Sequence, residues 1–230
     1  MTQASYGQFC PVAMAAEVLC TRWTMLVVRE LVSGSTRFND LRRGVPRMSR
    51  TLLSRRLKEL EHAGIVERRP VPGEHGVQEY RLTSAGEDLY PVVEAFGLWG
   101  QKWVQSDVSL QKLDPSLLMW DMRRNLDPSP LPSKRLVVQF RYTDLAPANR
   151  SWWLVVQPSG DVDLCRTDPG FEIDLYVETD LRTMTAVWMG LATVATARRN
   201  MSLDGDPEIV RTMQSWLGLS PFAAQPKLVP

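Results

Sequence analysis

The chain is poor in the residues that most often carry catalysis and metal binding. Its 230 residues include only three cysteines and two histidines. The cysteines at positions 10, 20 and 165 form no CxxC pair, and neither histidine has a companion at the spacing of a metal site or a catalytic triad. Glycine-rich phosphate-binding motifs and the GxSxG nucleophile motif are missing too. We therefore expect no metal, no cofactor and no enzymatic activity.

Long apolar runs are also missing. No stretch approaches the roughly 20 apolar residues that cross a bilayer. The first ten residues, MTQASYGQFC, do not combine a basic start with an apolar segment, as a secretory signal peptide would. Together with the few scattered cysteines, these absences predict a protein of the reducing cytoplasm that does not act at a membrane.

Positive charge, in contrast, is concentrated in one short stretch. The whole chain has a formal net charge of only +1. Between residues 37 and 58, eight basic residues stand against the single acid Asp40, a local net charge of +7. A near-neutral protein with one strongly basic segment is expected to bind a polyanion.

The second half of this basic segment has the pattern of an amphipathic helix. Ser49 is its expected N-cap, and Gly64 follows as a stop signal. At about 100° per residue, one side is apolar, with Leu53, Leu57 and Leu60. The opposite side is polar and basic, with Thr51, Ser54, Arg55, Lys58 and His62. Such side chains bind phosphates, and an arginine can also bind guanine through two hydrogen bonds. Taken alone, this helix fits equally well a solvated basic face that binds nothing.

The flanking segments favour the DNA-binding interpretation. Two helices, one opening at Pro11 and one capped by Thr21, and a short helix around Phe38 are expected before the basic helix. Strand-like segments at 65–69 and 77–82 follow it, joined by the turn-rich tip PVPGEHG. This is the order of a winged helix-turn-helix, whose third helix enters the major groove. The wing is expected to bring Arg68, Arg69 and His75 near the flanking phosphates.

The last helix of this half is unusually apolar. Ser84 and Glu87 have the spacing of a capping box at its start. Its large apolar residues exceed what a small winged domain needs for its own core: Leu89, Val92, Val93, Phe96, Trp99 and Trp103. A homodimer would bury them, and two symmetry-related recognition helices would match a palindromic operator.

Several separated motifs of this half occur in the order seen in a known family. They are CPVAMAAEVLCTRWTMLVVRELVSGSTRFNDLRRGVPRMSRTLLSRRLKELEHAGIVERR, EYRLTSAG and LWGQKW, over residues 8–104. In these motifs the chain resembles the HxlR family of bacterial winged-helix regulators. The resemblance implies dimeric binding of double-stranded DNA through the helix that starts at Ser49. The expected DNA contacts are Arg37, Asn39, Arg42, Arg47, Ser49, Arg50, Thr51, Ser54, Arg55, Lys58, Arg68, Arg69 and His75.

The resemblance also directs attention to Cys10, because members of the family carry a cysteine in the same CPV context. In some of them it senses electrophiles or oxidants. From the residues alone, Cys10 is either a small residue at a helix start or a thiolate that the helix N-terminus stabilises. Cys20, in contrast, is expected to be buried within its helix.

The second half has the pattern of a separate α+β domain. We place the boundary after residue 105, with a linker over 106–113, so that the domains are 1–105 and 106–230. Asp114 and Pro115 begin a helix, and four alternating segments between 136 and 178 are expected strands. A helix capped by Asp180, a short fifth strand and a final helix from Asp206 follow. About five strands with helices against one face are expected.

This second half resembles the sterol-carrier-protein-like fold over about residues 110–220. The similarity rests on LYVETDLRTMTAVWMG, ATARRNMSLDGDPEIV and the strand series before them. The resemblance implies a pocket for a small apolar or lipid-like ligand between sheet and helices, with Trp120, Phe140, Trp153, Phe171, Met184, Trp188 and Trp216 as candidate lining residues. Methionine and tryptophan suit an adaptable apolar cavity, but they would equally fill the core of a small sheet.

Together these patterns predict a cytoplasmic, dimeric, one-component transcriptional regulator whose second domain senses a small apolar ligand. Two alternatives stay open. One is a thiol-based regulator that senses oxidants or electrophiles at Cys10 and has a purely structural second domain. The other is a lipid-binding carrier protein.

Overall fold

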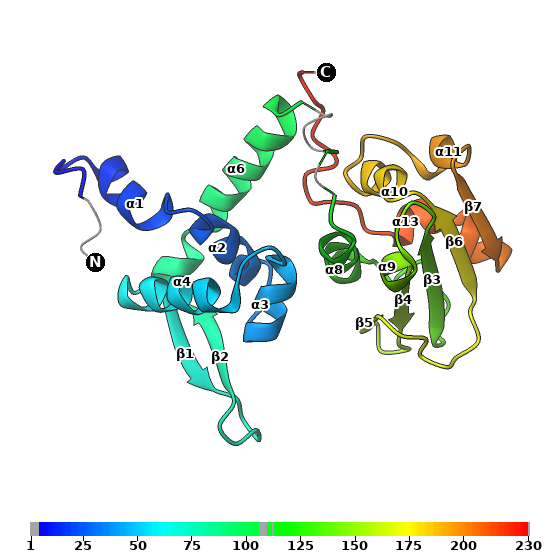
Figure 1. Ribbon diagram of the computed structural model, residues 1–230, viewed down its shortest axis with the longest axis horizontal. Helices are drawn as coiled ribbons and strands as arrows, with labels where there is room; N and C mark the ends of the chain where they lie inside the picture. Colours follow the sequence, from blue (N-terminus) through cyan, green and yellow to red (C-terminus); the bar gives the residue numbers. More distant parts are fainter. Residues whose placement is uncertain (1–4, 106–109, 112, 230) are drawn as a thin grey trace. The chain divides into compact units, whose positions relative to one another are not determined.

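The chain forms two compact units in the computed structural model, which describes residues 5–105, 110–111 and 113–229 (Figure 1). The first unit comprises Met1–Gly97 and the second comprises Leu98–Pro230. The expected linker over 106–113 lies partly outside the described residues, at 106–109 and 112.

The first unit is a helical bundle with a two-stranded hairpin. Its elements are α1 (Pro11–Leu19), α2 (Thr24–Val32), α3 (Phe38–Gly44), α4 (Arg50–His62), β1 (Val66–Pro70), β2 (Gln78–Leu82), α5 (Ser84–Glu87) and the start of α6 (Tyr90–Trp103). Its core is made by one side of each of α2, α3 and α4, where Val27, Leu41 and Leu57 are completely buried. The burial of these apolar side chains is the main force that holds the three helices together.

Two helix starts differ from the sequence expectation. α2 begins at Thr24, and its N-cap is Trp23 in a left-handed conformation (φ 78°), so Thr21 does not cap it. The capping box expected at Ser84 is also wrong, because Thr83 is the N-cap and its Oγ1 accepts a hydrogen bond from Gly86 N at 3.2 Å. The same hydroxyl donates to Gly64 O at 2.6 Å, which ties the start of α5 to the chain segment that follows α4.

The hairpin is the wing. β1 and β2 pair antiparallel, with Val66 opposite Leu82 and Pro70 opposite Gln78. Tyr80 N donates to Thr36 O at 2.8 Å, which ties the wing to the segment before α3. The arrangement of α3, α4 and this hairpin confirms the expected helix-turn-helix with a wing.

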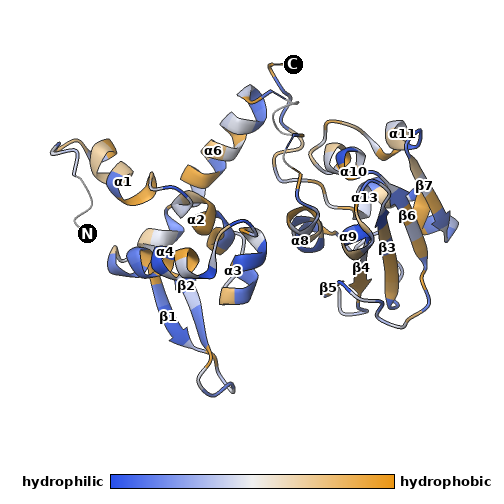
Figure 2. Ribbon diagram, viewed as in Figure 1, coloured by the Kyte–Doolittle hydropathy of each residue, from blue (hydrophilic) through white to orange (hydrophobic). Residues whose placement is uncertain are grey.

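The second unit contains a five-stranded mixed sheet. Its strands are β3 (Leu136–Tyr142), β4 (Ser151–Val156), β5 (Val162–Cys165), β6 (Leu175–Thr179) and β7 (Met201–Gly205), in the spatial order β5-β4-β3-β6-β7. β3 pairs antiparallel with β4 and parallel with β6, while β4–β5 and β6–β7 are antiparallel. β3 and β4 are mostly hydrophobic, as central strands should be (Figure 2).

Six helices accompany the sheet in the part that the structure describes: α8 (Pro115–Asn125), α9 (Pro147–Arg150), α10 (Leu181–Trp188), α11 (Val194–Ala197), α12 (Pro207–Arg211) and α13 (Met213–Trp216). One face of the sheet forms a large core with α8, α10, α12 and α13, to which Phe140, Met184 and Trp216 contribute. The opposite face holds a small cluster of Val137, Trp153 and Val155. The expected caps Asp114, Asp180 and Asp206 are all in place, each accepting hydrogen bonds from its own helix start.

Candidate nucleic-acid interface

The start and the orientation of α4 are both fixed by contacts within the first unit. Ser49 Oγ accepts a hydrogen bond from Leu52 N at 3.2 Å and so caps the helix. Leu53, Leu57 and Leu60 are buried on its inner side, as expected. Because the inner side cannot rotate outward without exposing these leucines, the opposite side is held toward solvent.

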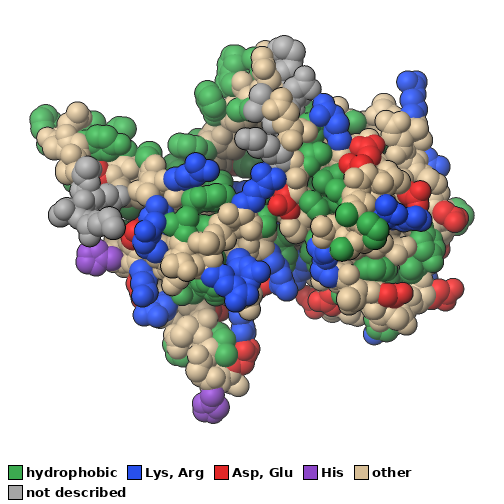
Figure 3. Space-filling model, in the orientation of Figure 1, with side chains coloured by type: hydrophobic (Ala, Val, Ile, Leu, Met, Phe, Trp, Pro, Cys, Tyr) green, Lys and Arg blue, Asp and Glu red, His purple; other side chains and the backbone are tan. Residues whose placement is uncertain are grey.

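We call that opposite side the α4 outer face, and it consists of Thr51, Ser54, Arg55, Lys58 and His62. All of these residues are exposed except Ser54, which is half-buried. The Arg55 side chain is 60% exposed and lies a loose 3.9 Å from Glu59 Oε1. Lysine and arginine side chains gather over α3 and α4 (Figure 3). The face thus offers hydroxyl donors and cations with room to reach a ligand.

Arg56 is the exception among the eight basic residues. It is only 8% exposed, its Nε donates to Arg22 O at 3.1 Å, and its Nη1 pairs with Glu59. Arg56 therefore fastens α4 to the turn between α1 and α2, and it does not add to the basic surface. The count of charges along the sequence did not separate this structural arginine from the others.

Arg37 lies at the N-cap of α3 and is held by the wing tip. Its Nη1 and Nη2 donate to the two carboxylate oxygens of Glu74 at 2.7 and 2.6 Å. The same hydrogen bonds lower the pKa of the Glu74 carboxyl below its usual value. Arg37 was expected to contact DNA, but in this structure its guanidinium connects α3 to the wing.

The other candidate cations fall into two groups. In the wing, Arg68 pairs with Glu61 at 3.0 Å and Arg69 pairs with Glu67. Arg42, Arg50 and Lys58, in contrast, have no ion-pair partner within 5–105, 110–111 and 113–229. The three are therefore the cations most available to an external anion. The remaining expected contacts are all solvent-exposed, namely Asn39, Arg47, Ser49 and, at the wing tip, His75.

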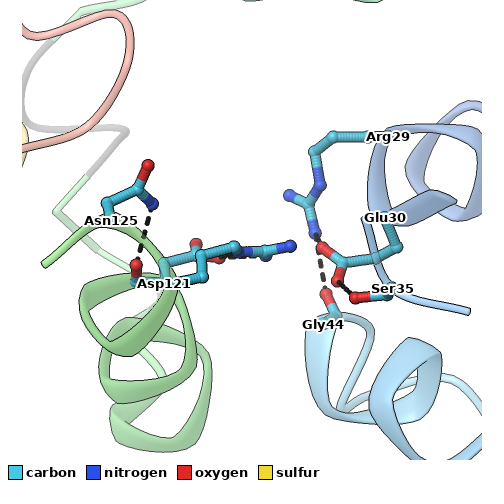
Figure 4. Close-up of polar contacts among 7 residues, drawn as sticks. Arg29, Glu30, Ser35, Gly44, Asp121 and Asn125 are labelled. Atoms are coloured by element: carbon cyan, nitrogen blue, oxygen red, sulfur yellow. Dashed lines mark hydrogen bonds and ion pairs between the residues drawn. The ribbon is translucent and has the colours of Figure 1, made fainter. Parts of the chain in front are cut away.

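A buried carboxylate that the sequence pattern did not single out lies between α2 and the end of α3. Glu30 of α2 is completely buried and accepts hydrogen bonds from Arg29 Nη2 at 2.6 Å and Ser35 Oγ at 3.3 Å (Figure 4). Arg29 Nη2 also donates to Gly44 O at 2.8 Å, at the end of α3. The only signal in the sequence was an acid next to Arg29 in a helix whose other residues are mostly apolar.

Cys10 is the N-cap of α1 and is half-buried. Its pKa is lowered from the usual thiol value by the nearby backbone N–H groups of Ala13 and Val12 at the helix start, although the side chain makes no cap hydrogen bond. Cys20, expected to be buried, is exposed at the C-terminal end of the same helix. Cys165 lies on β5, and there burial raises the pKa of the thiol.

The structure does not bring the seven expected pocket residues of the second unit together. Phe140, Met184 and Trp216 are completely buried in the large core, and Trp188 packs against it. Trp153 lies on the opposite face of the sheet, because its neighbours Trp152 and Leu154 point into the large core. Phe171 is 43% exposed and stacks with Arg135 at 4.3 Å. Trp120 is buried on α8 beside Arg123, at 5.0 Å.

In the part of the chain that the structure describes, no three His, Cys, Asp or Glu side chains gather as a metal site. In the same part, no single helix has the length and apolar composition of a membrane span. Of the described helices, only α1 and α2 taken together reach the required length and apolar composition, and the chain bends by 86° at the break between them.

A basic helix presented beside a wing defines a winged helix-turn-helix protein. Residues 18–108 match the family described as HxlR-like helix-turn-helix. The chain belongs to this family of HTH-type transcriptional regulators through its N-terminal half. The match does not include the second sheet, so the sterol-carrier-protein-like resemblance stays a prediction.

Individual relatives agree with this assignment. The uncharacterized HTH-type transcriptional regulator YvaP of Bacillus subtilis is 36% identical over 113 residues, which are 49% of this chain and 96% of that protein. The uncharacterized HTH-type transcriptional regulator sll1512 of Synechocystis is 34% identical, over 46% of this chain and 84% of that protein. Among solved structures, the redox regulator HypR in its reduced form is 33% identical over 40% of this chain and 91% of that chain, with a TM-score of 0.38.

Proposed function

We propose that the protein binds palindromic operator DNA as a homodimer, with α4 of each copy in the major groove. The observation that carries this proposal is the α4 outer face, which is held toward solvent by the buried leucines on its other side. Lys58 on this face, Arg50 in the first turn of α4 and Arg42 on α3 lack ion-pair partners in the described ranges and add positive charge. A helix of 13 residues with this face has the size and chemistry that enter a major groove.

The residues divide by the chemistry they offer. Thr51, Ser54 and Arg55 are the candidates for base edges, because they lie in the N-terminal half of α4, the part of a recognition helix that contacts bases. The candidates for phosphates and for positioning are Arg37, Asn39, Arg42, Arg47, Ser49, Arg50, Lys58, Arg68, Arg69 and His75. Arg37, Arg68 and Arg69 would have to exchange their present carboxylate partners for DNA.

The dimer is supported by apolar side chains left in solvent on α1 and α6. Phe9, just before α1, is 97% exposed and Val12 is 76% exposed, while Phe96 and Trp99 on α6 are 60% and 62% exposed. Hydrophobic side chains cover parts of both helices in Figure 3. Exposed apolar patches of this kind mark interaction surfaces. A two-fold pairing would set two α4 helices about 34 Å apart, one turn of B-form DNA.

A salt-dependent gel shift on the upstream intergenic region of the gene tests the proposal. We expect Arg55→Ala to weaken operator binding by about 1–3 kcal/mol, because it removes a two-hydrogen-bond contact to guanine. Binding to random DNA should change far less. Arg211→Ala is the matched control, since Arg211 is an exposed arginine of the second unit. An equal loss on operator and random DNA would move Arg55 to the phosphate contacts, and no salt-dependent binding at all would remove the proposal.

For the second unit we propose ligand sensing, in which a small apolar molecule changes the spacing of the two recognition helices. One candidate lining residue, Trp188 at the large core, supports it, because its indole Nε1 is buried without a hydrogen-bond partner in the described structure. Such a change requires the ligand to prefer one conformation. Native mass spectrometry of the purified protein should reveal a retained apolar molecule, and its absence would favour a purely structural unit.

A second candidate function is thiol-based sensing at Cys10. The specific observation is the lowered thiol pKa, which the backbone N–H groups at the start of α1 produce. Diamide should then reduce operator binding by the wild type and leave the Cys10→Ser variant unaffected. If diamide changes neither protein, Cys10 is a helix-start residue without a sensing role.

A further inference from the structure

A cavity of about 390 Å³ lies in the first unit beside the C-terminal half of α4. We call it the α1–α4 cavity. Its apolar wall is formed by Val18 of α1, Leu60 of α4 and Ala63. Its polar wall includes Thr24, Arg55 and Lys58. A volume of this size accommodates a small organic molecule.

The charges around the α1–α4 cavity favour an anion. Arg55 and Lys58 both lie on its wall, and neither is tightly held, since the nearest carboxylate oxygen to Arg55 is 3.9 Å away. The one acid of the wall, Glu59, is already paired with the buried Arg56. The cavity therefore combines an apolar surface with two cations, of which Arg55 has only a long contact with Glu59 and Lys58 has no ion-pair partner in the described residues.

Thr24 supplies a separate indication of a ligand. It is 3% exposed, and its Oγ1 is buried without a hydrogen-bond partner in the described structure. Buried hydroxyls are nearly always hydrogen-bonded, because an unpaired one loses the bonds it made to water. Thr24 lines the cavity, and rotation of its side chain would let this hydroxyl donate to a ligand oxygen placed there.

We propose that the α1–α4 cavity binds a small aromatic carboxylate and that this ligand competes with DNA. The carboxylate would lie against Arg55 and Lys58, and the ring against Val18 and Leu60. Because Arg55 and Lys58 also belong to the α4 outer face, one ligand would occupy two of the cations that DNA needs. This second part rests on the proposed DNA binding, whereas the binding of the ligand to the free protein does not.

Benzoate is the probe, and benzamide is its uncharged match. By titration calorimetry, benzoate should bind the free full-length protein and benzamide should bind at least about tenfold more weakly, because it lacks the charge-assisted contact. Lys58→Met should weaken benzoate binding by about fivefold or more. Thr24→Val keeps the shape and removes the unpaired hydroxyl, so it should fold normally, bind DNA normally and lose benzoate affinity by about threefold or more.

Arg50→Met is the matched control on the same helix. Arg50 is exposed in the first turn of α4 and is not part of the cavity wall. This variant should lose DNA affinity and keep benzoate affinity, the reverse of Thr24→Val. In the wild type, the apparent Kd for the operator should rise in proportion to benzoate concentration above the benzoate Kd.

The outcomes separate the two proposals. If benzoate binding depends on Lys58 and Thr24 but the protein binds no DNA, the proposed ligand site is supported and the proposed DNA-binding function is wrong. If benzoate does not weaken DNA binding, the proposed competition between the ligand and DNA is wrong. If benzoate and benzamide bind equally, the proposed carboxylate site is wrong. The same conclusion follows if benzoate binds Lys58→Met and Thr24→Val as tightly as the wild type. If benzoate binds only when the dimer is broken, the cavity belongs to the contact between copies and the proposal is wrong.

Discussion

At the scale of the residue, the buried carboxylate of Glu30 helps to fix how the end of α3 packs against α2. A buried carboxylate is costly unless hydrogen bonds satisfy it, and here Arg29 and Ser35 do so. Gly44 makes this arrangement possible, because a Cβ at that position would lie 1.8 Å from Glu30 Cδ. The end of α3 can therefore approach α2 closely only with glycine at this place.

Gly44→Ala should consequently destabilise the first unit. The added methyl group must displace the Glu30 carboxylate from its hydrogen bonds, and overpacking of this kind costs about 1–3 kcal/mol. Thermal unfolding followed by circular dichroism measures the loss. Gly100→Ala on α6 is the control, since its added methyl group would meet no atom within 4 Å. Equal stability of Gly44→Ala and the wild type would show that Glu30 has another low-energy position.

The cysteines give a pH-dependent prediction at the same scale. The pKa of Cys10 is lowered and that of Cys165 is raised, so at any pH near neutrality a larger fraction of Cys10 is thiolate. Only the thiolate is alkylated rapidly. Iodoacetamide should therefore modify Cys10 first, with a half-maximal rate at a pH below that of an ordinary thiol, and Cys165 later. Mass spectrometry of quenched samples distinguishes the two sites, and the opposite order would contradict the assigned helix-start effect.

At the scale of the element, α4 depends on its cap. Ser49 Oγ satisfies Leu52 N, one of the helix-start N–H groups that have no partner within the helix. Ser49→Ala should cost about 0.5–2 kcal/mol of unfolding free energy. Ser49→Asn can accept the same hydrogen bond and should restore the loss. Urea unfolding of the three proteins tests this, and an alanine variant as stable as the asparagine variant would show that the cap contributes nothing.

Elements whose signal is local were predictable from the sequence. The leucine stripe of α4, the alternating strands β3 and β6, and the caps Asp114, Asp180 and Asp206 follow from spacing along the chain. The errors involve interactions across the fold. Nothing near Arg37 in the sequence indicates Glu74, and nothing beside Arg56 shows that its Nε reaches Arg22 O.

The other two errors, at the cap of α5 and in the expected pocket, arise where two neighbouring residues in the sequence are both suitable by type. Thr83 and Ser84 can both cap a helix, and the choice depends on which hydroxyl also reaches Gly64 O, a contact 19 residues away in sequence. In the second unit, the expected pocket residues were chosen by type, without regard to the side of the strand. Trp153 is buried on the face opposite Phe140 because adjacent positions of a strand alternate between faces.

At the scale of the whole molecule, the proposed function depends on two α4 helices held at one separation. A single α4 contacts only one half-site, whereas a dimer joins two such contacts and gains affinity without any new contact residue. In the first unit as described, the large exposed apolar side chains lie on α1 and α6, apart from Tyr6, Phe9 and Leu26. Under the proposed function, a dimer contact through these two helices would remove this apolar surface from solvent.

Phe96→Arg tests this arrangement. Phe96 is 60% exposed, so the substitution should leave the folded chain nearly as stable as the wild type, while a charge buried in a dimer contact would separate the copies. Analytical ultracentrifugation should show a monomer, and operator affinity should fall by at least about 100-fold because the second half-site contact is lost. Tyr176→Arg, at a similarly exposed aromatic residue of β6, should keep both the dimer and the affinity. A Phe96→Arg protein that stays dimeric would place the contact elsewhere, whereas a monomer that binds the full operator as tightly as the wild type would mean that α4 does not act in pairs.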